Sequence, residues 1–278
     1  MTDSSKRIIA LLTDFGIRGS HYVASMKGVI SNIAQNSIII DISHTITPYS
    51  IIEAAYTIRT TYQLFPENSI FVFVIDPGVG SERNIVVLRT EDNYYFVGPD
   101  NGILPNALNS DISECFKVQN DEYFYHPVSN TFHGRDIMAP CGAHIANDVP
   151  LEKFGPSFDP QNLRRINIPL DFNKKKKSIR FTIQYTDSFG NITSNIPLDE
   201  NNYINDFSQK LTQGTKIEFT LNNQNYKGTF TTHFSNVKKN EILFLKGSTG
   251  YLEISKNQSN LADELQVHSG NQIKLKFS

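Results

Sequence analysis

The chain has 278 residues, of which 39% are hydrophobic, enough to build one large domain or two of ordinary size and too apolar for a disordered protein. Its 26 basic and 28 acidic residues leave a formal charge of -2, so the charge balance does not favour nucleic acid or an anionic membrane as the main partner. A small-molecule ligand is the better expectation.

Cysteine usage and hydropathy indicate the compartment. Cys115 and Cys141 lie far apart with no CxxC pair, which is typical of reduced thiols in a cytosolic protein. No apolar run approaches the roughly 20 residues that a membrane helix needs. The N-terminal MTDSSKR precedes a strand-like run with no cleavage-site pattern. We therefore expect a cytoplasmic protein.

The first half of the chain alternates between the two secondary-structure periods. Short apolar or β-branched runs predict strands over 8–13, 37–42 and 70–75, and helical spacing predicts helices over 22–34 and 51–65. This β-α-β-α-β order predicts an α/β domain with a largely parallel central sheet.

Two further elements are predicted before residue 150. Residues 85–89 and 94–97, joined by an Asp-Asn turn, predict a hairpin added to the sheet. A helix should run from about Gly134 to Asn147. Pro140 inside it predicts a kink or a late start.

The composition changes after Pro169. The segment DFNKKKKS, residues 171–178, holds four consecutive lysines and is typical of a solvated connector. We therefore predict an α/β domain over 1–170, a Lys-rich linker over 171–178 and a smaller all-β domain over 179–278. Short strand-like runs predict a small sandwich or barrel there, at 179–185, 192–196, 216–221, 242–245, 251–254 and 273–277.

Three acids close predicted strands of the first sheet: Asp14, Asp41 and Asp76. We expect them to gather in the crevice where α/β proteins bind ligands, although each alone could be a solvated turn residue. Asp76 begins DPGVGSER, in which Gly78 and Gly80 let the backbone reverse. The motif lacks the GxxxxGK[ST] pattern and is a weak phosphate signal.

Three other stretches contain residue types that catalyse or bind. In TFHGRDIMAP, His133 precedes a predicted helix start and is open to roles as base, ligand or ordinary hydrogen-bonded residue. YTDSFGNITSNI, residues 185–196, combines an acid, a ring and amides, as a purine and ribose reader would, or as an ordinary Asn- and Gly-rich turn would. KGSTGYLEI, residues 246–254, places two hydroxyls and two glycines before a strand.

Seven blocks occur in order along nearly the whole chain: LLTDFG, HTITPYSIIEAA, FVIDPGVGSER, GPDNGIL, FHGRD, DSFGNITSNI and GSTGYLEI. In this order the chain resembles the S-adenosyl-L-methionine (SAM) hydroxide adenosyltransferase family, the hydrolase relatives of the fluorinase and chlorinase enzymes. The resemblance implies hydrolysis of SAM to adenosine and L-methionine by attack of water or hydroxide at the ribose C5′. It implies no cofactor beyond the substrate and no metal.

The resemblance also assigns the attacking water to three residues. An aspartate, an arginine and a histidine hold it in the hydrolases, and the matching positions are Asp76, Arg83 and His133. The halogenating relatives have tyrosines where Asp76 and His133 stand. The fluorinase has a serine where Gly134 stands and a long insertion after the equivalent of Arg83, which is missing here. The chain therefore resembles the hydrolase branch.

The family pattern implies substrate contacts in both domains. It places Asp14 on the ribose hydroxyls, Tyr49 near the ribose and methionine portion, Asn191 on adenine with Phe234 and Phe189 stacking, and Gln258 as a backbone contact. Asp187 and Ser248 match positions on the methionine carboxylate and amine, and Thr249 stands where the fluorinase has an arginine. The resemblance implies a homotrimer with each site between the α/β domain of one subunit and the β domain of its neighbour.

Other functions are open at this point. A catalytically silent SAM or adenosine-binding protein would bind tightly without turnover, and a SAM-dependent halogenase would form a 5′-halo-5′-deoxyadenosine. A metal-dependent nucleotide phosphatase would also gather strand-end acids, and a chelator would inactivate it.

Overall fold

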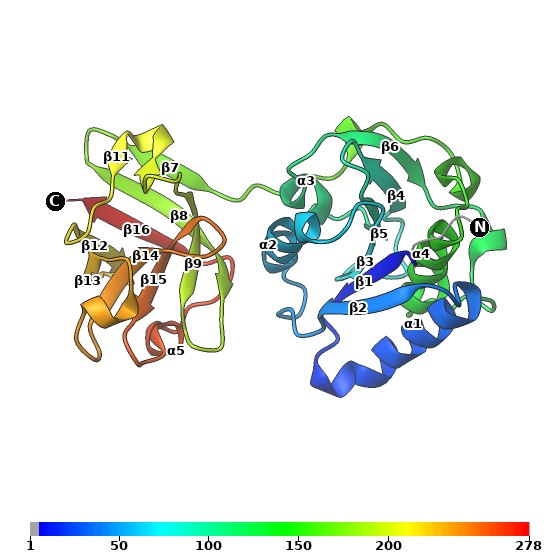
Figure 1. Ribbon diagram of the computed structural model, residues 1–278, viewed down its shortest axis with the longest axis horizontal. Coiled ribbons are helices and arrows are strands. Elements are labelled where there is room, and N and C mark those ends of the chain that lie inside the picture. The colour runs from blue at the N-terminus through cyan, green and yellow to red at the C-terminus, as the bar shows by residue number, and fades with distance from the viewer. Residues whose placement is uncertain (1–5, 278) are drawn as a thin grey trace. The chain divides into compact units, whose positions relative to one another are not determined.

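The computed structural model describes residues 6–277, and the chain divides into two compact units (Figure 1). The first unit ends at Ile166 and the second begins at Asn167. Over residues 6–277, none of the helices combines the length and the apolar character that crossing a membrane requires.

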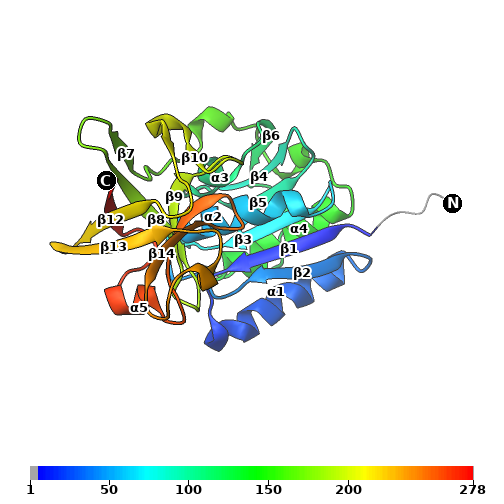
Figure 2. The same ribbon diagram turned by 60° about the vertical axis from the view of Figure 1, so that its left-hand side comes forward.

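The first unit is built on a six-stranded sheet with the order β2-β1-β3-β5-β4-β6 (Figure 2). Strands β2, β1, β3 and β5 are parallel, and β4 is antiparallel to β5 and β6. This confirms the predicted largely parallel sheet with an added hairpin, whereas β6 was not predicted. The strands are β1 (Ile8–Thr13), β2 (Ile38–Ser43), β3 (Ile70–Val74), β4 (Ile85–Thr90), β5 (Tyr95–Pro99) and β6 (Ile112–Lys117).

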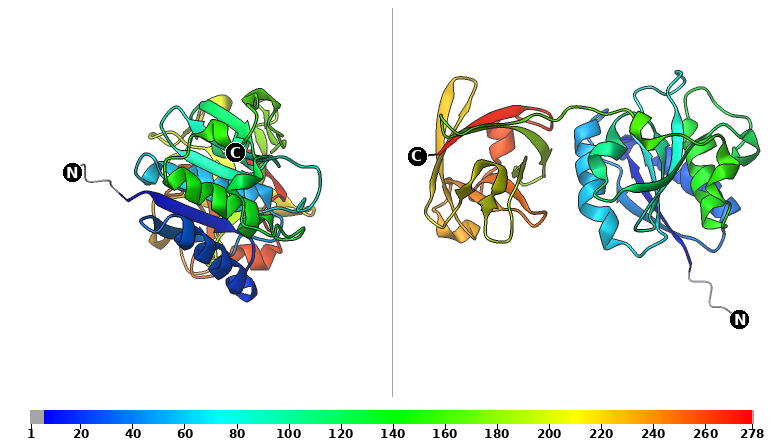
Figure 3. Two further views of the ribbon diagram at one scale, coloured as in Figure 1. Left: turned by 90° about the vertical axis from the view of Figure 1, so that its right-hand side faces the viewer. Right: turned by 90° about the horizontal axis from the view of Figure 1, so that it is seen from above.

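Helices cover both faces of this sheet (Figure 3). Alternate residues of β1 show why: Ile9 and Leu11 pack with the cluster that includes α1 (Ser20–Ile33) and α4 (Ala139–Ala146). Ala10 and Leu12 pack with the cluster that includes α2 (Ile51–Thr61) and α3 (Ile103–Ala107). Since successive side chains of a strand point to opposite faces, a strand buried on both sides is apolar throughout.

The helix starts follow local chemistry. The Ser50 side chain caps α2 by accepting a hydrogen bond from the Glu53 N–H (3.3 Å), and Glu53 in turn accepts one from the Thr47 N–H (3.3 Å). The chain around Gly134 first forms a π-helical turn over Gly134–Met138, and α4 begins only at Ala139 with Pro140 in its first turn. This confirms the late start predicted from Pro140.

The second unit is a closed barrel of seven strands, which confirms the barrel alternative of the sequence prediction. Its order is β16-β12-β13-β14-β15-β9-β8, and a β8–β16 pairing closes it around a core of phenylalanines and aliphatic residues. The strands are β8 (Ser178–Thr186), β9 (Ile192–Pro197), β12 (Lys216–Leu221), β13 (Gln224–Phe230), β14 (Ile242–Lys246), β15 (Tyr251–Lys256) and β16 (Gln272–Phe277), with β10 (Tyr203–Ile204), β11 (Gln209–Lys210) and α5 (Leu261–Leu265) beside them.

The Lys-rich segment 171–178 is not the linker that was predicted. Leu170–Asn173 forms strand β7, which pairs with β8, and the lysines lie in the exposed turn between these two strands. Leu170 and Phe172 pack against the barrel core. The charge run is solvated, as a like-charge run should be, but it is a hairpin turn inside the second unit.

Two glycines give opposite stability predictions. A Cβ at Gly98 would lie 2.2 Å from the buried Phe73 ring, whereas one at Gly28, exposed in α1, would contact nothing within 4 Å. Gly98→Ala should lower the free energy of unfolding by about 1–3 kcal/mol through overpacking. Gly28→Ala should raise it by up to about 1 kcal/mol through helix propensity. Urea unfolding followed by circular dichroism checks both; equal effects would contradict the packing of β5 on β3.

Candidate active site

A pocket of about 320 Å³ lies at the carboxyl ends of β1 and β3. Strand β1 has β2 on one side and β3 on the other, so it is the point where the strand order reverses and where α/β sheets bind ligands. The pocket is lined by Asp14, Phe15, Pro48, Tyr49, Val74, Asp76, Val79, Thr131, Phe132, His133 and Gly134.

Of the three strand-end acids, Asp14 and Asp76 meet in this pocket and Asp41 does not. Asp41 lies within β2, is exposed and pairs with Lys27 (2.6 Å) and His44 (3.1 Å). The prediction for Asp41 is wrong because β2 continues to Ser43, so Asp41 is an ordinary outward-facing strand residue with a lysine partner on α1.

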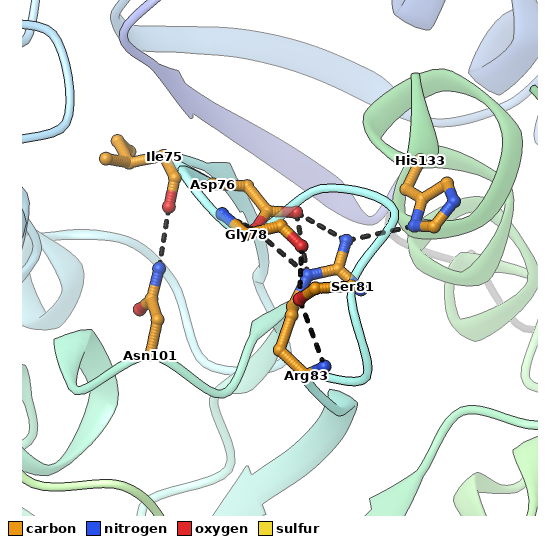
Figure 4. A network of polar contacts seen from close by, with 7 residues as sticks. All are labelled: Ile75, Asp76, Gly78, Ser81, Arg83, Asn101 and His133. Carbon is orange, nitrogen blue, oxygen red and sulfur yellow. Dashed lines mark hydrogen bonds and ion pairs between the residues drawn. The ribbon is translucent and has the colours of Figure 1, made fainter. Parts of the chain in front are cut away.

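Asp76, Arg83 and His133 form one polar cluster (Figure 4). The Arg83 Nε donates to both carboxylate oxygens of Asp76 (2.9 and 3.0 Å), and its Nη2 donates to Asp76 Oδ2 and to His133 Nδ1 (2.9 Å). The Asp76 and Arg83 side chains are only 5% and 10% exposed. A guanidinium has donors in a planar fork and no acceptor, so it can hold the carboxylate and the imidazole together.

The turn after β3 returns Arg83 to Asp76. Asp76 Oδ1 accepts from the Gly78 N–H (3.2 Å), and the Ser81 hydroxyl donates to the Gly78 carbonyl (2.7 Å) while accepting from the Arg83 N–H (3.3 Å). Gly80 has a φ of 76°, which favours glycine. The two glycines therefore serve the turn that pairs Arg83 with Asp76.

The Arg83 contact defines the state of His133. Because the guanidinium only donates, Nδ1 must accept, and the ring is then neutral with its proton on Nε2. Burial lowers the pKa of His133 below its ordinary value, and the Arg83 charge lowers it further. The backbone beside it lies against β3, since a Cβ at Gly134 would come within 2.9 Å of Val74.

Asp14 and Tyr49 also meet in the pocket. Asp14 Oδ2 accepts from the Tyr49 N–H (2.8 Å), and Tyr49 has a φ of 67° and a side chain that is 69% exposed. Burial raises the pKa of Asp14. Asp14 thus holds the loop that presents the Tyr49 ring at the pocket rim.

The second unit contains its own pocket, of about 390 Å³, which brings together four of the predicted residues. Phe189, Asn191, Phe234 and Gln258 line it with Lys256, Asn257 and Ser259. Both rings are exposed, Phe189 at 77% and Phe234 at 40%. Exposed aromatic rings beside an amide are suited to stack on and read a flat heteroaromatic ligand.

Asp187 builds the turn below this pocket. Its Oδ1 accepts from the N–H groups of Phe189 (3.0 Å) and Asn191 (2.9 Å), and its Oδ2 accepts from Asn191 Nδ2 (2.8 Å). This last bond orients the Asn191 amide, because a carboxylate can only face the NH₂ side. The Asn191 carbonyl oxygen and one N–H are left to meet a ligand.

Ser248 and Thr249 do not line this pocket. They are exposed in the turn between β14 and β15, where the Gly247 N–H donates to the Tyr251 carbonyl (2.9 Å). Sequence reasoning also missed several lining residues. Phe15 and Phe132 were inside quoted motifs but carried no polar signal, and nothing in the sequence singled out 256–259 apart from Gln258.

Within residues 6–277, no cluster of three or more His, Cys, Asp or Glu side chains is arranged to hold a metal ion.

A mostly parallel sheet with a carboxylate, guanidinium and imidazole at its switch point, followed by a closed β-barrel, defines a two-domain α/β and β enzyme. Residues 9–155 match the SAM hydroxide adenosyltransferase N-terminal domain and residues 181–274 match its C-terminal domain. The chain belongs to the SAM hydroxide adenosyltransferase family, which confirms the resemblance found in the sequence.

Three similar proteins illustrate the family. The chain is 36% identical to a protein of Methanocaldococcus jannaschii named (R)-S-adenosyl-L-methionine hydrolase, over 99% of this chain and 98% of that one. It is 24% identical to the fluorinase of Actinopolyspora mzabensis, over 99% of each. A crystal structure of an uncharacterized conserved protein from Thermotoga maritima superposes with a TM-score of 0.84 at 32% identity, covering 96% of this chain and 99% of that one.

The contact between Arg83 and His133 predicts the direction of the His133 pKa shift. This pKa should lie below the ordinary value of about 6.5, and Arg83→Met should raise it, because one positive charge next to the ring is removed while Asp76 remains. Carbon-13 NMR of histidine-labelled protein measures both titrations, with His133→Gln identifying the signal. An unchanged or lowered pKa in Arg83→Met would contradict the contact.

Proposed function

We propose that this chain hydrolyses SAM to adenosine and L-methionine by attack of water or hydroxide at the ribose C5′. The observation that carries the proposal is the Asp76, Arg83 and His133 cluster, of which Asp76 and His133 border the pocket at the sheet edge. The hydrolase name of the Methanocaldococcus relative supports it.

The chemistry requires a positioned nucleophile more than an acid. Attack at C5′ expels a neutral thioether from a sulfonium, so the leaving group needs no proton. Asp76 can accept a hydrogen bond from water while it is held by Arg83, which orients the water in line with the carbon–sulfur bond. The Nε2–H of His133 and the charge of Arg83 stabilise hydroxide character on the oxygen.

The remaining contacts follow the pockets. In this proposal Asp14 binds the ribose hydroxyls and Tyr49 covers the ribose and methionine portion. In the barrel pocket the Asn191 amide reads adenine, Phe189 and Phe234 stack on it, and Gln258 contributes its backbone. The family resemblance adds Asp187 and Ser248, which line neither pocket, as contacts of the methionine carboxylate and amine, with Thr249 next to Ser248. We further propose a homotrimer in which the first unit of one subunit and the barrel of its neighbour share each substrate molecule.

Asp76→Ala should lower SAM turnover by at least about a hundredfold, since it removes both a water ligand and the partner of Arg83. Asp41→Ala is the matched control, because that acid belongs to the same sheet but lies outside the pocket. Chromatography separates the products formed from SAM, without metal and with chloride added. The wild type should form adenosine and methionine in equal amounts. A 5′-halo-nucleoside, or bound nucleoside with no turnover, would contradict the hydrolase proposal.

Asn191→Ala should weaken adenosine binding and leave the first unit intact, because its amide reads the base from the barrel.

Co-expression of Asp76→Ala with Asn191→Ala tests whether the site is shared by neighbouring subunits or formed within a single chain. If neighbouring subunits share it, random trimers regain about a quarter of the wild-type activity per site. If a single chain forms the whole site, the mixture is no more active than the two variants measured separately.

A further inference from the structure

A second cavity lies behind the Arg83 and His133 pair. Its volume is about 270 Å³, and it is lined by both of these residues together with Ser81, Glu82, Lys117 and Gln119, among others. Asp76 lines the first pocket and not this one, and Arg83 lines this one and not the first. His133 alone borders both. His133 is therefore a single side chain between the two cavities, and next to it Arg83 and its partner Asp76 face one cavity each; Arg83 and His133 together form the wall of the second cavity.

The proposed reaction needs solvent on the far side of the substrate. The oxygen of a water bonds to C5′ as the C5′–S bond breaks and leaves its electron pair on sulfur. One proton of that water stays on the new 5′-hydroxyl and the other is released, so each turnover takes up a water and gives off a proton. In-line attack places the water between C5′ and the Asp76 and His133 side of the pocket. In the proposed binding mode the substrate lies between this water and the mouth of the pocket.

The lining of the second cavity fits a solvent compartment. Ser81, Glu82 and Gln119 are exposed, and Lys117 is half-buried, so polar groups reach from the wall to the surface. Apolar Ile85, Val118 and Ile137 form its floor. Polar, open cavities of this size hold several water molecules.

We propose that this second cavity, called the rear cavity below, supplies the attacking water past the Arg83 and His133 side chains and receives the released proton while the substrate is bound. The proposal rests on the proposed hydrolase function. The front pocket, the one at the carboxyl ends of β1 and β3, then holds the ribose with its reacting C5′, and the rear cavity holds the water. The wall residues both hold the nucleophile and separate it from bulk solvent.

A thiol placed in the rear cavity allows it to be filled after the protein has folded. Gln119 is exposed and uses its backbone, not its side chain, to donate to the Phe154 carbonyl (2.8 Å). The native thiols will not compete: Cys115 and Cys141 are buried, and burial raises the pKa of Cys115 to about 12 and raises that of Cys141 as well. Gln119→Cys is treated with a benzyl or a methyl methanethiosulfonate, and each sample is compared with itself before treatment.

The benzyl adduct should lower kcat by about tenfold or more, and the methyl adduct should lower it less, because it fills less of the cavity. The KM for SAM and the Kd for adenosine should stay unchanged, since neither adduct reaches the front pocket. Glu152→Cys is the control: Glu152 is exposed on a different cavity, which shares no residue with either of these. Its adducts should leave kcat unaltered.

A benzyl adduct at Gln119→Cys that leaves kcat unchanged would overturn the rear route. So would a loss of kcat matched by an equal loss of adenosine affinity, because blocked water does not weaken binding. Failure of the hydrolase proposal looks different: the untreated protein would then make no adenosine from SAM.

Discussion

The Arg83 guanidinium is the interaction on which the rest of the site depends. It holds Asp76 with two nitrogens and His133 with one, at 10% exposure of its own side chain. A buried pair of this kind is costly to break, because the surviving partner keeps a charge without compensation. Lysine is a point charge and cannot hold two partners in one plane. The DPGVGSER turn, the neutral state of His133 and the position of Asp76 all follow from accommodating this one group.

Packing around β3 sets the depth of the cluster. On one face of the sheet, Gly98 leaves room for the Phe73 ring of β3. On the other face, Gly134 lets the start of the π-helical turn pack against Val74 of β3. Any side chain at these glycines would push the neighbouring segment away from β3. Asp76 lies two residues beyond the end of this strand, so the same close packing that stabilises the sheet brings His133 within reach of Arg83.

The sequence predicted most of the fold, because buried parallel strands and amphipathic helices have strong periodicity. It failed where local composition and tertiary pairing disagree: lysines suggested a linker at 171–178, but Leu170 and Phe172 pack on the barrel core. Strand-end position correctly grouped Asp14 with Asp76, and failed for Asp41 because β2 runs past it. The contact between Arg83 and His133, fifty residues apart, has no local signature. Only the resemblance of seven ordered motifs joined those two residues.

In the proposed reaction, the charge at position 76 decides between water and a bare halide as the nucleophile. Two unit charges about 4 Å apart interact by about 4 kcal/mol at the effective dielectric of protein sites, which is roughly a thousandfold in binding. A carboxylate at 5% exposure therefore repels a bare halide while it accepts a hydrogen bond from water. Arg83 alone would attract an anion, but the Asp76 carboxylate offsets its charge and accepts hydrogen bonds from its Nε and Nη2. The cluster is thus electrically suited to a neutral nucleophile that gains negative charge only during the reaction, and water meets that requirement.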